Sequence, residues 1–157
     1  MRVLVLGNSG SGKSHCARAL AASHALAHLD LDTIVWQPGR IAVARAAGDV
    51  AHDVRAFIDA NERWVVEGCY GDVIEAALGD CSELVFMNPG REVCLANNRK
   101  RPWEAHKYAS PEAQLSMLPF LLDWVGLYYS RDDSCSYIVH RRVFDGFSGH
   151  KREVLNP

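Results

Sequence analysis

The sequence lacks several features that would place the protein outside ordinary soluble enzymes. No stretch approaches the roughly 20 apolar residues of a membrane span, and the apolar run at residues 3–6 is too short for a signal peptide. The sequence has five cysteines, and no two of them form a Cys-x-x-Cys pair, which argues against a disulfide framework or structural zinc site. Basic residues are not in excess, since 17 Lys and Arg accompany 19 Asp and Glu. We therefore expect a reduced, cytoplasmic protein with no membrane partner, and the charge disfavours nucleic acid as a partner.

The pattern that is present indicates one α/β domain. The chain has 157 residues, and short β-rich runs alternate with longer segments of helical periodicity. This alternation predicts a doubly wound fold, with a five-stranded parallel sheet and helices on both faces. Strands are predicted at about residues 3–6, 25–31, 64–66, 84–87 and 137–139. Helices are predicted at about residues 13–22, 42–61, 72–78, 91–98 and 111–129, and the tail from Arg141 is predicted to be irregular.

Residues 7–14 match the phosphate-loop pattern G-x-x-x-x-G-K-[ST] in full. Glycines let successive backbone N–H groups point at phosphate oxygens, and the following helix adds its positive dipole end. Lys13 should reach the β and γ phosphates, and the Ser14 hydroxyl should bind Mg²⁺. A flexible turn is the alternative, but the strand before and the helix after favour a site for ATP with Mg²⁺. The predicted nucleotide-binding residues are Gly7, Asn8, Ser9, Gly10, Ser11, Gly12, Lys13, Ser14 and His15.

Acidic residues close two of the predicted strands, where ligands bind in folds of this class. Asp30 and Asp32 end the second strand and should share one face, because alternate strand residues point the same way. Asp30 is a candidate to hold water on Mg²⁺, and Asp32 is a candidate to accept or orient the proton of an attacking hydroxyl. A helix cap is the alternative. Glu67 is a candidate for the outer shell of Mg²⁺, or else a solvated strand end.

Basic and aromatic residues supply the remaining candidates. Arg99 and Arg101 follow the fourth strand and are predicted to neutralise charge on the transferred phosphoryl group. A solvated helix end is the alternative for this cluster. Arg141 is a candidate to stack on the nucleobase, because it is predicted to follow the fifth strand. The candidates to bind an acceptor, besides Asp32, are Trp36, Gly68 and Tyr70.

Through these motifs the chain resembles small P-loop kinases of the adenylate kinase and shikimate kinase type. It resembles most the adenylate-kinase-related proteins once called DNA topology modulation or flagellar-regulator proteins. The resemblance covers about residues 1–103 and rests on the phosphate loop, His28-Leu-Asp-Leu-Asp, Trp36, Trp64-Val-Val-Glu-Gly-Cys-Tyr and a basic lid. It implies a single nucleoside monophosphate kinase-like domain over residues 1–157. Within this domain it implies an acceptor-binding helical segment at about 33–62 and a short lid at about 98–111.

The resemblance also has limits that bear on the acceptor. The strand-end pair and the dipeptide Arg101-Pro102 match features that serve Mg²⁺, acceptor and lid in shikimate kinases. Glu67, however, stands where the topology-modulation group usually has Asp, and Asn97 stands where an arginine is common. The acceptor motif Phe-Arg-x-x-Glu is absent, which disfavours shikimate.

Three functions fit the sequence. A kinase would transfer the γ-phosphoryl group of ATP to a hydroxyl or phosphate of a small-molecule acceptor, and the acidic pair and basic lid favour it. An ATP-dependent regulatory switch or binding module would explain the departures from the kinase pattern. A kinase of polynucleotide ends gains little support from a net charge of −2. The expected partners are a nucleoside triphosphate and an acceptor, and the chain should be a monomer or homodimer.

Overall fold

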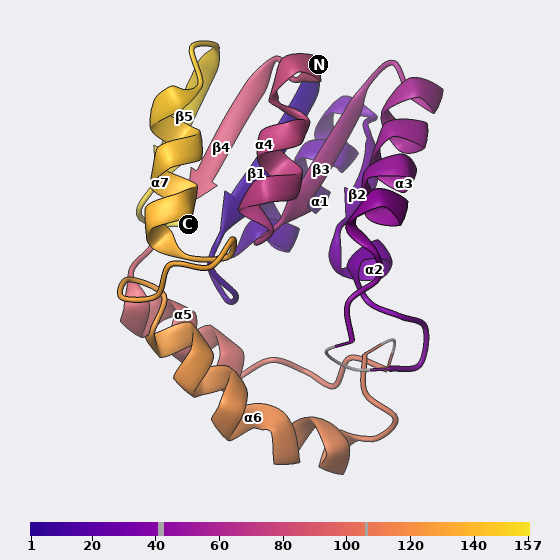
Figure 1. The fold of residues 1–157 in the computed structure, drawn as a ribbon. Helices are drawn as coiled ribbons and strands as arrows, with labels where there is room; N and C mark the ends of the chain where they lie inside the picture. Colours follow the sequence, from indigo (N-terminus) through magenta and orange to yellow (C-terminus); the bar gives the residue numbers. More distant parts are fainter. Residues whose placement is uncertain (41–42, 106) are drawn as a thin grey trace.

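The computed structural model describes residues 1–40, 43–105 and 107–157 (Figure 1). Its five strands are all parallel and form one sheet in the order β2-β3-β1-β4-β5. The strands are β1 (Arg2–Gly7), β2 (Ala27–Asp30), β3 (Trp64–Gly68), β4 (Glu83–Met87) and β5 (His150–Val154). The helices are α1 (Lys13–His24), α2 (Asp32–Val35), α3 (Ala47–Ala60), α4 (Gly71–Ala76), α5 (Arg91–Arg99), α6 (Pro111–Gly126) and α7 (Tyr137–Gly146), with a 3₁₀ helix at Leu78–Asp80. The predicted fold class is confirmed.

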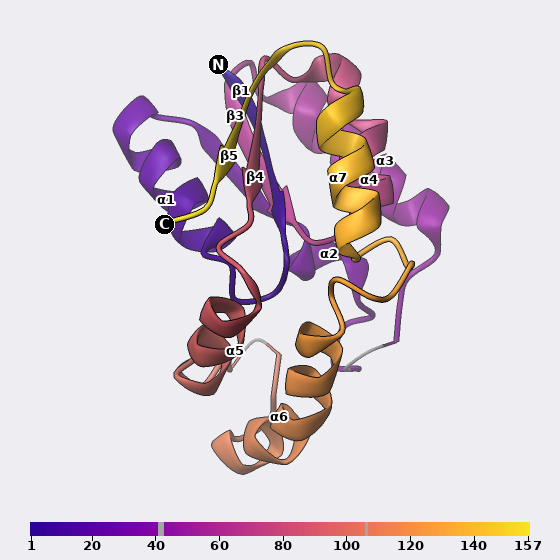
Figure 2. The ribbon, with the colours of Figure 1, turned by 90° about the vertical axis from the view of Figure 1, so that its left-hand side faces the viewer.

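Helices cover both faces of the sheet, which explains why its central strands are continuously apolar. Alternate residues of β1 pack in different clusters. Val3 and Val5 pack with Ala17 of α1, whereas Leu4 and Leu6 belong to a larger cluster that includes residues of α3, α4 and α7. Figure 2 shows α1 on one side of the sheet and these three helices on the other.

Two further helices lie beyond the carboxyl ends of the strands (Figure 1). α5 and α6 pack on each other through Cys94, Leu95 and Val125. The predicted lid, residues 98–111, forms their connection, and its residue 106 lies outside the described residues. This connection lies beyond the edge of the sheet where the phosphate loop begins (Figure 1).

Within the described ranges, no helix is both long and apolar enough to cross a membrane.

The predicted end of the chain is wrong. Residues 137–139 open helix α7, and the fifth strand is β5, within the tail that was predicted to be irregular. His140, Val143 and Phe144 are buried at helical spacing, whereas Ile138 is 63% exposed. β5 has the polar sequence His-Lys-Arg-Glu-Val and pairs only with β4, at the edge of the sheet. An edge strand of this kind lacks the apolar run that identifies buried strands.

Smaller differences concern the ends of helices. The helix predicted at 42–61 begins at Ala47, and residue 42 lies outside the described residues. The helix predicted at 111–129 ends at Gly126. The segment predicted as one helix at 72–78 divides into α4 and the start of the 3₁₀ helix. Helix ends of this kind are decided by local caps and packing more than by periodicity.

A matched pair of substitutions tests the placement of α7. Ile74 in α4 is fully buried, so Ile74→Ala should lower the free energy of unfolding by about 2 to 5 kcal/mol through lost burial and a cavity. Ile138→Ala makes the same chemical change on the exposed side of α7 and should alter it by no more than about 0.5 kcal/mol. Urea denaturation measures both. A large loss at Ile138 would mean that it is buried, as the strand interpretation requires.

Candidate functional site

The phosphate loop leaves the end of β1 and enters α1 in a conformation that requires glycine. Gly10 and Gly12 have φ angles of 78° and 93°, in the left-handed region that favours glycine. A Cβ atom on Gly7 would lie 2.3 Å from the carbonyl oxygen of Met87, so only glycine lets the loop pass the end of β4. Lys13 folds back over the loop, where its Nζ donates a hydrogen bond of 2.9 Å to the carbonyl oxygen of Asn8.

The end of α5 holds the loop from the other side. The Ser9 hydroxyl donates to the Asn98 side-chain oxygen at 3.0 Å, and the Asn97 amide donates to the Gly10 carbonyl at 2.8 Å. Arg101 donates to the Ser9 oxygen at 3.3 Å, so this predicted catalytic cation does lie beside the phosphate loop. Arg99 is exposed on α5. Asn97, which replaces an expected arginine, therefore supports the loop in this chain.

The three predicted acids lie at neighbouring strand ends. Asp30 pairs in register with Glu67 across β2 and β3. The strand ends at Asp30, so the alternation argument does not apply to Asp32, which begins α2. Asp30 instead accepts the backbone N–H of Asp32 at 2.9 Å in the turn before α2, whose N-cap residue is Leu31. Burial is the largest influence on the pKa of each of the three carboxylates and raises it, whereas the charge of Lys13 lowers it.

Asp32 is held in the ionised form by two donors. The Tyr70 hydroxyl donates to one of its oxygens at 2.6 Å, and the Lys107 ammonium donates to the other at 2.6 Å. Burial alone would raise the pKa of Asp32, but the charge and hydrogen bond of Lys107 and the hydrogen bond of Tyr70 outweigh it and hold this pKa below its usual value. Sequence reasoning missed Lys107. Its only signal was its position inside the predicted lid, where Arg99 and Arg101 were preferred.

The lid connects Asp32 to the phosphate loop through one acidic residue. Glu104 lies 3.4 Å from Arg101 and 3.3 Å from Lys107. Arg101 in turn contacts Ser9 of the loop, while Lys107 contacts Asp32. The two cations therefore approach the two halves of the site from the same segment of chain.

Two buried polar atoms near the loop lack a hydrogen-bond partner in the described residues. They are the Ser11 hydroxyl and one carboxylate oxygen of Glu67, which has no hydrogen bond and lies 3.9 Å from Nε2 of His28. Glu67 is only 1% exposed. Burial raises the pKa of Glu67, and the charge of Lys13 lowers it by less. Because burying such atoms unpaired is costly, both fit a site completed by phosphate oxygens and a hydrated cation. Glu67 is therefore not a solvated strand end.

The candidate metal residues suit Mg²⁺ in their chemistry. Ser14, Asp30 and Glu67 offer only oxygen, the donor that this hard cation prefers. Among the described residues, no group of three or more His, Cys, Asp or Glu forms a metal cage. Mg²⁺ is usually held by one or two carboxylates, water and substrate phosphates rather than by an all-protein cage. The residues present thus fit a Mg²⁺ ion that arrives with a nucleotide.

Two of the acceptor candidates border a cavity of about 710 Å³ between α3 and α4. Trp36 and Tyr70 both line it, with ring centroids 6.1 Å apart in an edge-on arrangement. Gly68 is buried, and a Cβ atom there would lie 2.8 Å from the Leu31 side chain. Gly68 therefore serves close packing beneath α2.

Two predicted nucleotide contacts lie in less favourable places. Arg141 does not follow a strand, since it belongs to α7. Its guanidinium donates to Glu153 at 2.6 Å and lies over the rings of Phe86, Tyr137 and Phe144, so it already stabilises the packing of α7 on the sheet. Because Arg141 lies in a helix, the reason for choosing it as a nucleobase contact is removed. His15, the other predicted contact, is exposed in the first turn of α1.

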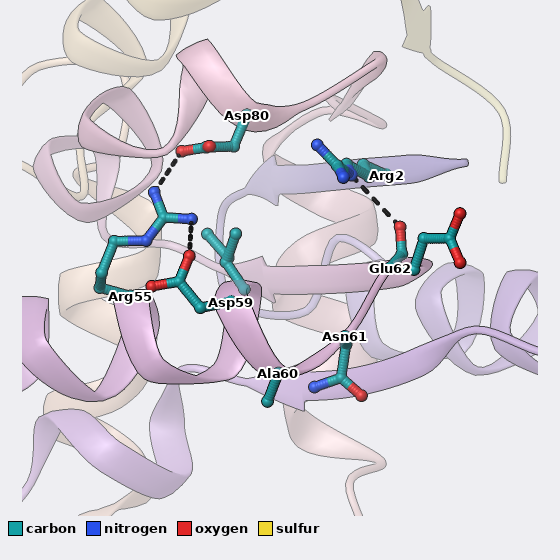
Figure 3. Close-up of a pocket in the computed structure, with 8 residues that line it drawn as sticks. Arg2, Arg55, Asp59, Ala60, Asn61, Glu62 and Asp80 are labelled. Carbon is teal, nitrogen blue, oxygen red and sulfur yellow. Dashed lines mark hydrogen bonds and ion pairs between the residues drawn. The ribbon is translucent and has the colours of Figure 1, made fainter.

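A second cavity lies at the opposite end of the sheet (Figure 3). It is formed near the start of β1 and the turn before β3, and its one ion-pair network among the described residues is centred on Arg55. Arg55 donates to Asp59 at 2.7 Å and to Asp80 at 2.8 Å, and Arg2 donates to the Glu62 carbonyl at 3.2 Å. These contacts hold the turns together at the end of the sheet remote from the phosphate loop.

Comparisons with known proteins establish the fold. No family model and no curated protein matches the sequence. Among solved structures, the chain is similar to a shikimate kinase from Aquifex aeolicus (TM-score 0.53, 16% identity, covering 100% of this chain and 89% of that one). It is also similar to a gluconokinase from Sinorhizobium meliloti, with a TM-score of 0.51 and 19% identity, covering 99% of this chain and 83% of that one. A sugar kinase from Janibacter gives a TM-score of 0.51 and 20% identity, covering 99% of this chain and 86% of that one. The doubly wound α/β fold that the sequence predicts is thus shared with these solved structures.

One buried histidine supports the connection that carries Tyr70. His140 accepts the Tyr128 hydroxyl at Nδ1, 2.8 Å away, and its Nε2–H donates to the Cys69 carbonyl at 2.7 Å. This arrangement requires a neutral ring, because the Nδ1 atom is an acceptor. Burial lowers the pKa of His140 to about 4. The imidazole thereby ties α7 to the segment between β3 and α4.

This low pKa predicts a stability that depends on pH. The unfolded chain binds the proton of His140 near pH 6.5, whereas the folded chain resists it until about pH 4. Stability should therefore fall as the pH drops from 6.5 to 4, and His140 should account for up to about 3 kcal/mol of the loss. Urea denaturation across this range should show a smaller loss for His140→Gln. The control His52→Gln, at an exposed position of α3, should keep the full slope. Equal slopes for both variants would refute the assignment.

Proposed function

We propose that the protein is an ATP-dependent phosphotransferase that moves the γ-phosphoryl group of ATP to a small-molecule acceptor. The observation that carries the proposal is the meeting of a complete phosphate loop with an ionised carboxylate, Asp32, at one edge of the sheet. A module that only binds nucleotide has no use for such a carboxylate. The fold shared with solved kinases supports this reading, and the motifs shared with the topology-modulation group suggest the nearest relatives.

The phosphate loop binds the nucleotide in this proposal. Backbone N–H groups of residues 7–14 surround the phosphates, Lys13 leaves the Asn8 carbonyl to contact the β and γ phosphates, and Ser11 gains the partner that it lacks. Ser14 would hold Mg²⁺, with Asp30 and Glu67 binding its water molecules. Bound Mg²⁺ would supply positive charge that stabilises the phosphoryl oxygens during transfer.

Asp32 acts on the acceptor. Its oxygen orients the acceptor hydroxyl and takes the proton as the hydroxyl oxygen forms a bond to the γ-phosphorus and the bond to ADP breaks. The pKa of Asp32 below its usual value keeps the carboxylate ionised and ready to accept a hydrogen bond. Tyr70 and Lys107 hold it in position.

The lid supplies positive charge from the side opposite the phosphate loop. Arg101 already lies at Ser9, and it is the proposed contact to the transferred group, with Arg99 in a supporting place. A guanidinium suits this role because it binds phosphate oxygens in a bidentate manner. The acceptor binds against the segment 33–62, next to Trp36 and Tyr70.

The experiment that tests the function combines an acceptor screen with Lys13→Ala. Purified protein should consume ATP only when an acceptor is added from a panel of alcohols, sugars and nucleosides. Lys13→Ala should reduce turnover by at least about 100-fold, because charge stabilisation in the transition state is lost. Arg18→Ala, an exposed cation on the same helix, should retain full activity. Tight ATP binding without transfer to any acceptor would favour a regulatory switch instead.

A second substitution separates chemistry from binding. Asp32→Asn should lower kcat by about 100- to 10,000-fold, the range typical of a lost proton acceptor. ATP affinity, measured by titration, should change little, because Asp32 does not contact the loop. Asp49→Asn, at an exposed site in α3, is the matched control. If Asp32→Asn turns over at the wild-type rate, its carboxylate has only a structural role.

A further inference from the structure

The cavity between α3 and α4 lies next to the proposed catalytic carboxylate, and Tyr70 connects the two. Tyr70 lines the cavity with its ring and reaches Asp32 with its hydroxyl at 2.6 Å. Val35, at the end of the short helix that Asp32 begins, also lines it. A compound in this cavity can therefore present a hydroxyl to Asp32, while its remaining atoms extend between the two helices.

The walls of the cavity are mainly apolar and partly aromatic. Aliphatic side chains of α3, such as Val50 and Val54, form one wall, and Val73 of α4 belongs to the other. Trp36, Tyr70 and Trp124 add aromatic rings to the lining, and Tyr70 contacts Asp32. One face of Trp124 is covered by Arg131, whose guanidinium lies 3.6 Å from the ring centroid. A volume of about 710 Å³ accommodates a compound of one or two rings.

The charges on the described lining do not suit an anion. Its two arginines, Arg45 and Arg55, are both engaged by carboxylates. Arg45 donates to Asp53 at 2.7 Å and to the Ile34 carbonyl at 2.8 Å, and Arg55 is shared between Asp59 and Asp80. Three aspartates also line the cavity: Asp72, Asp80 and Asp133. Asp80 and Asp133 are paired with Arg55 and Arg131, whereas Asp72 has no ion pair among the described residues. An acceptor with a carboxylate or phosphate would therefore meet no free cation in this lining and would be repelled by Asp72.

We propose that the acceptor is an uncharged hydroxyl compound that carries a flat ring, and that it binds in the cavity between α3 and α4. This inference rests on the proposed function, because it assigns the acceptor for the reaction at Asp32. The acceptor's ring lies against the aromatic residues near Tyr70, and its hydroxyl reaches the Asp32 oxygen. Sugar acids and monophosphates are excluded by charge rather than by size.

Binding can be measured without turnover through tryptophan fluorescence, since Trp36 and Trp124 line the cavity. The full chain is first saturated with Mg²⁺ and a non-hydrolysable ATP analogue, so that the phosphate loop is occupied. It is then titrated with adenosine, thymidine and 4-hydroxybenzyl alcohol, and with the carboxylate partner of each. At least one neutral probe should quench the fluorescence and bind about tenfold more tightly than its carboxylate partner, because a buried charge without a partner is costly.

A pair of variants shows that the measured binding occurs in this cavity. Ala51→Trp places a large side chain in the lining and should weaken binding of the neutral probe about tenfold or more. Ala56→Trp, at an exposed position of the same helix outside the lining, should leave it unchanged. Both variants should bind the ATP analogue as the wild type does.

Three results would overturn the inference. They are carboxylates that bind as tightly as their neutral partners, neutral probes that do not bind at all, and binding that Ala51→Trp leaves intact. Binding of the ATP analogue is recorded separately in every sample. Failure of the analogue to bind would refute the proposed function, whereas a bound analogue without the preference for neutral rings would refute only the acceptor assignment.

Discussion

The parallel register of β2, β3 and β1 is the constraint on which the whole site depends. It places Asp30 beside Glu67, and Glu67 beside Val5 of β1, just before the phosphate loop. Val5 and Glu67, 62 positions apart in the chain, thereby meet at one edge of the sheet. Because all strands point the same way, every connection that follows a strand contributes to the same surface.

That edge of the sheet holds more buried polar groups than the described side chains can pair by hydrogen bonds. Lid cations compensate Asp32 and stabilise the loop at Ser9, yet one oxygen of Glu67 and the Ser11 hydroxyl stay buried without a hydrogen bond among the described residues. Such groups reduce stability in a protein that binds nothing. Their presence at a phosphate loop is the pattern expected when a site is organised for a ligand before that ligand binds, as catalysis requires.

The sequence predicted those parts of the fold and site that depend on local patterns. The phosphate loop, the central strands and the acids after them follow from apolar runs and adjacent polar residues. Lys107 could not be predicted as the partner of Asp32, because that contact spans 75 positions and depends on how the lid folds back. β5 was missed because an edge strand needs little apolar surface, and Tyr137-Ile138-Val139 resembled a strand because three residues cannot distinguish the two periods.

The central claim is that the phosphate loop and the strand-end acids form one site for ATP with Mg²⁺. Calorimetric titration of the wild-type protein with ATP, with Mg²⁺ present and after its removal by chelation, tests this claim most directly. The account predicts saturable binding of one ATP per chain and an affinity that falls clearly when Mg²⁺ is removed. No saturable binding, or an affinity that is the same without Mg²⁺, would contradict it.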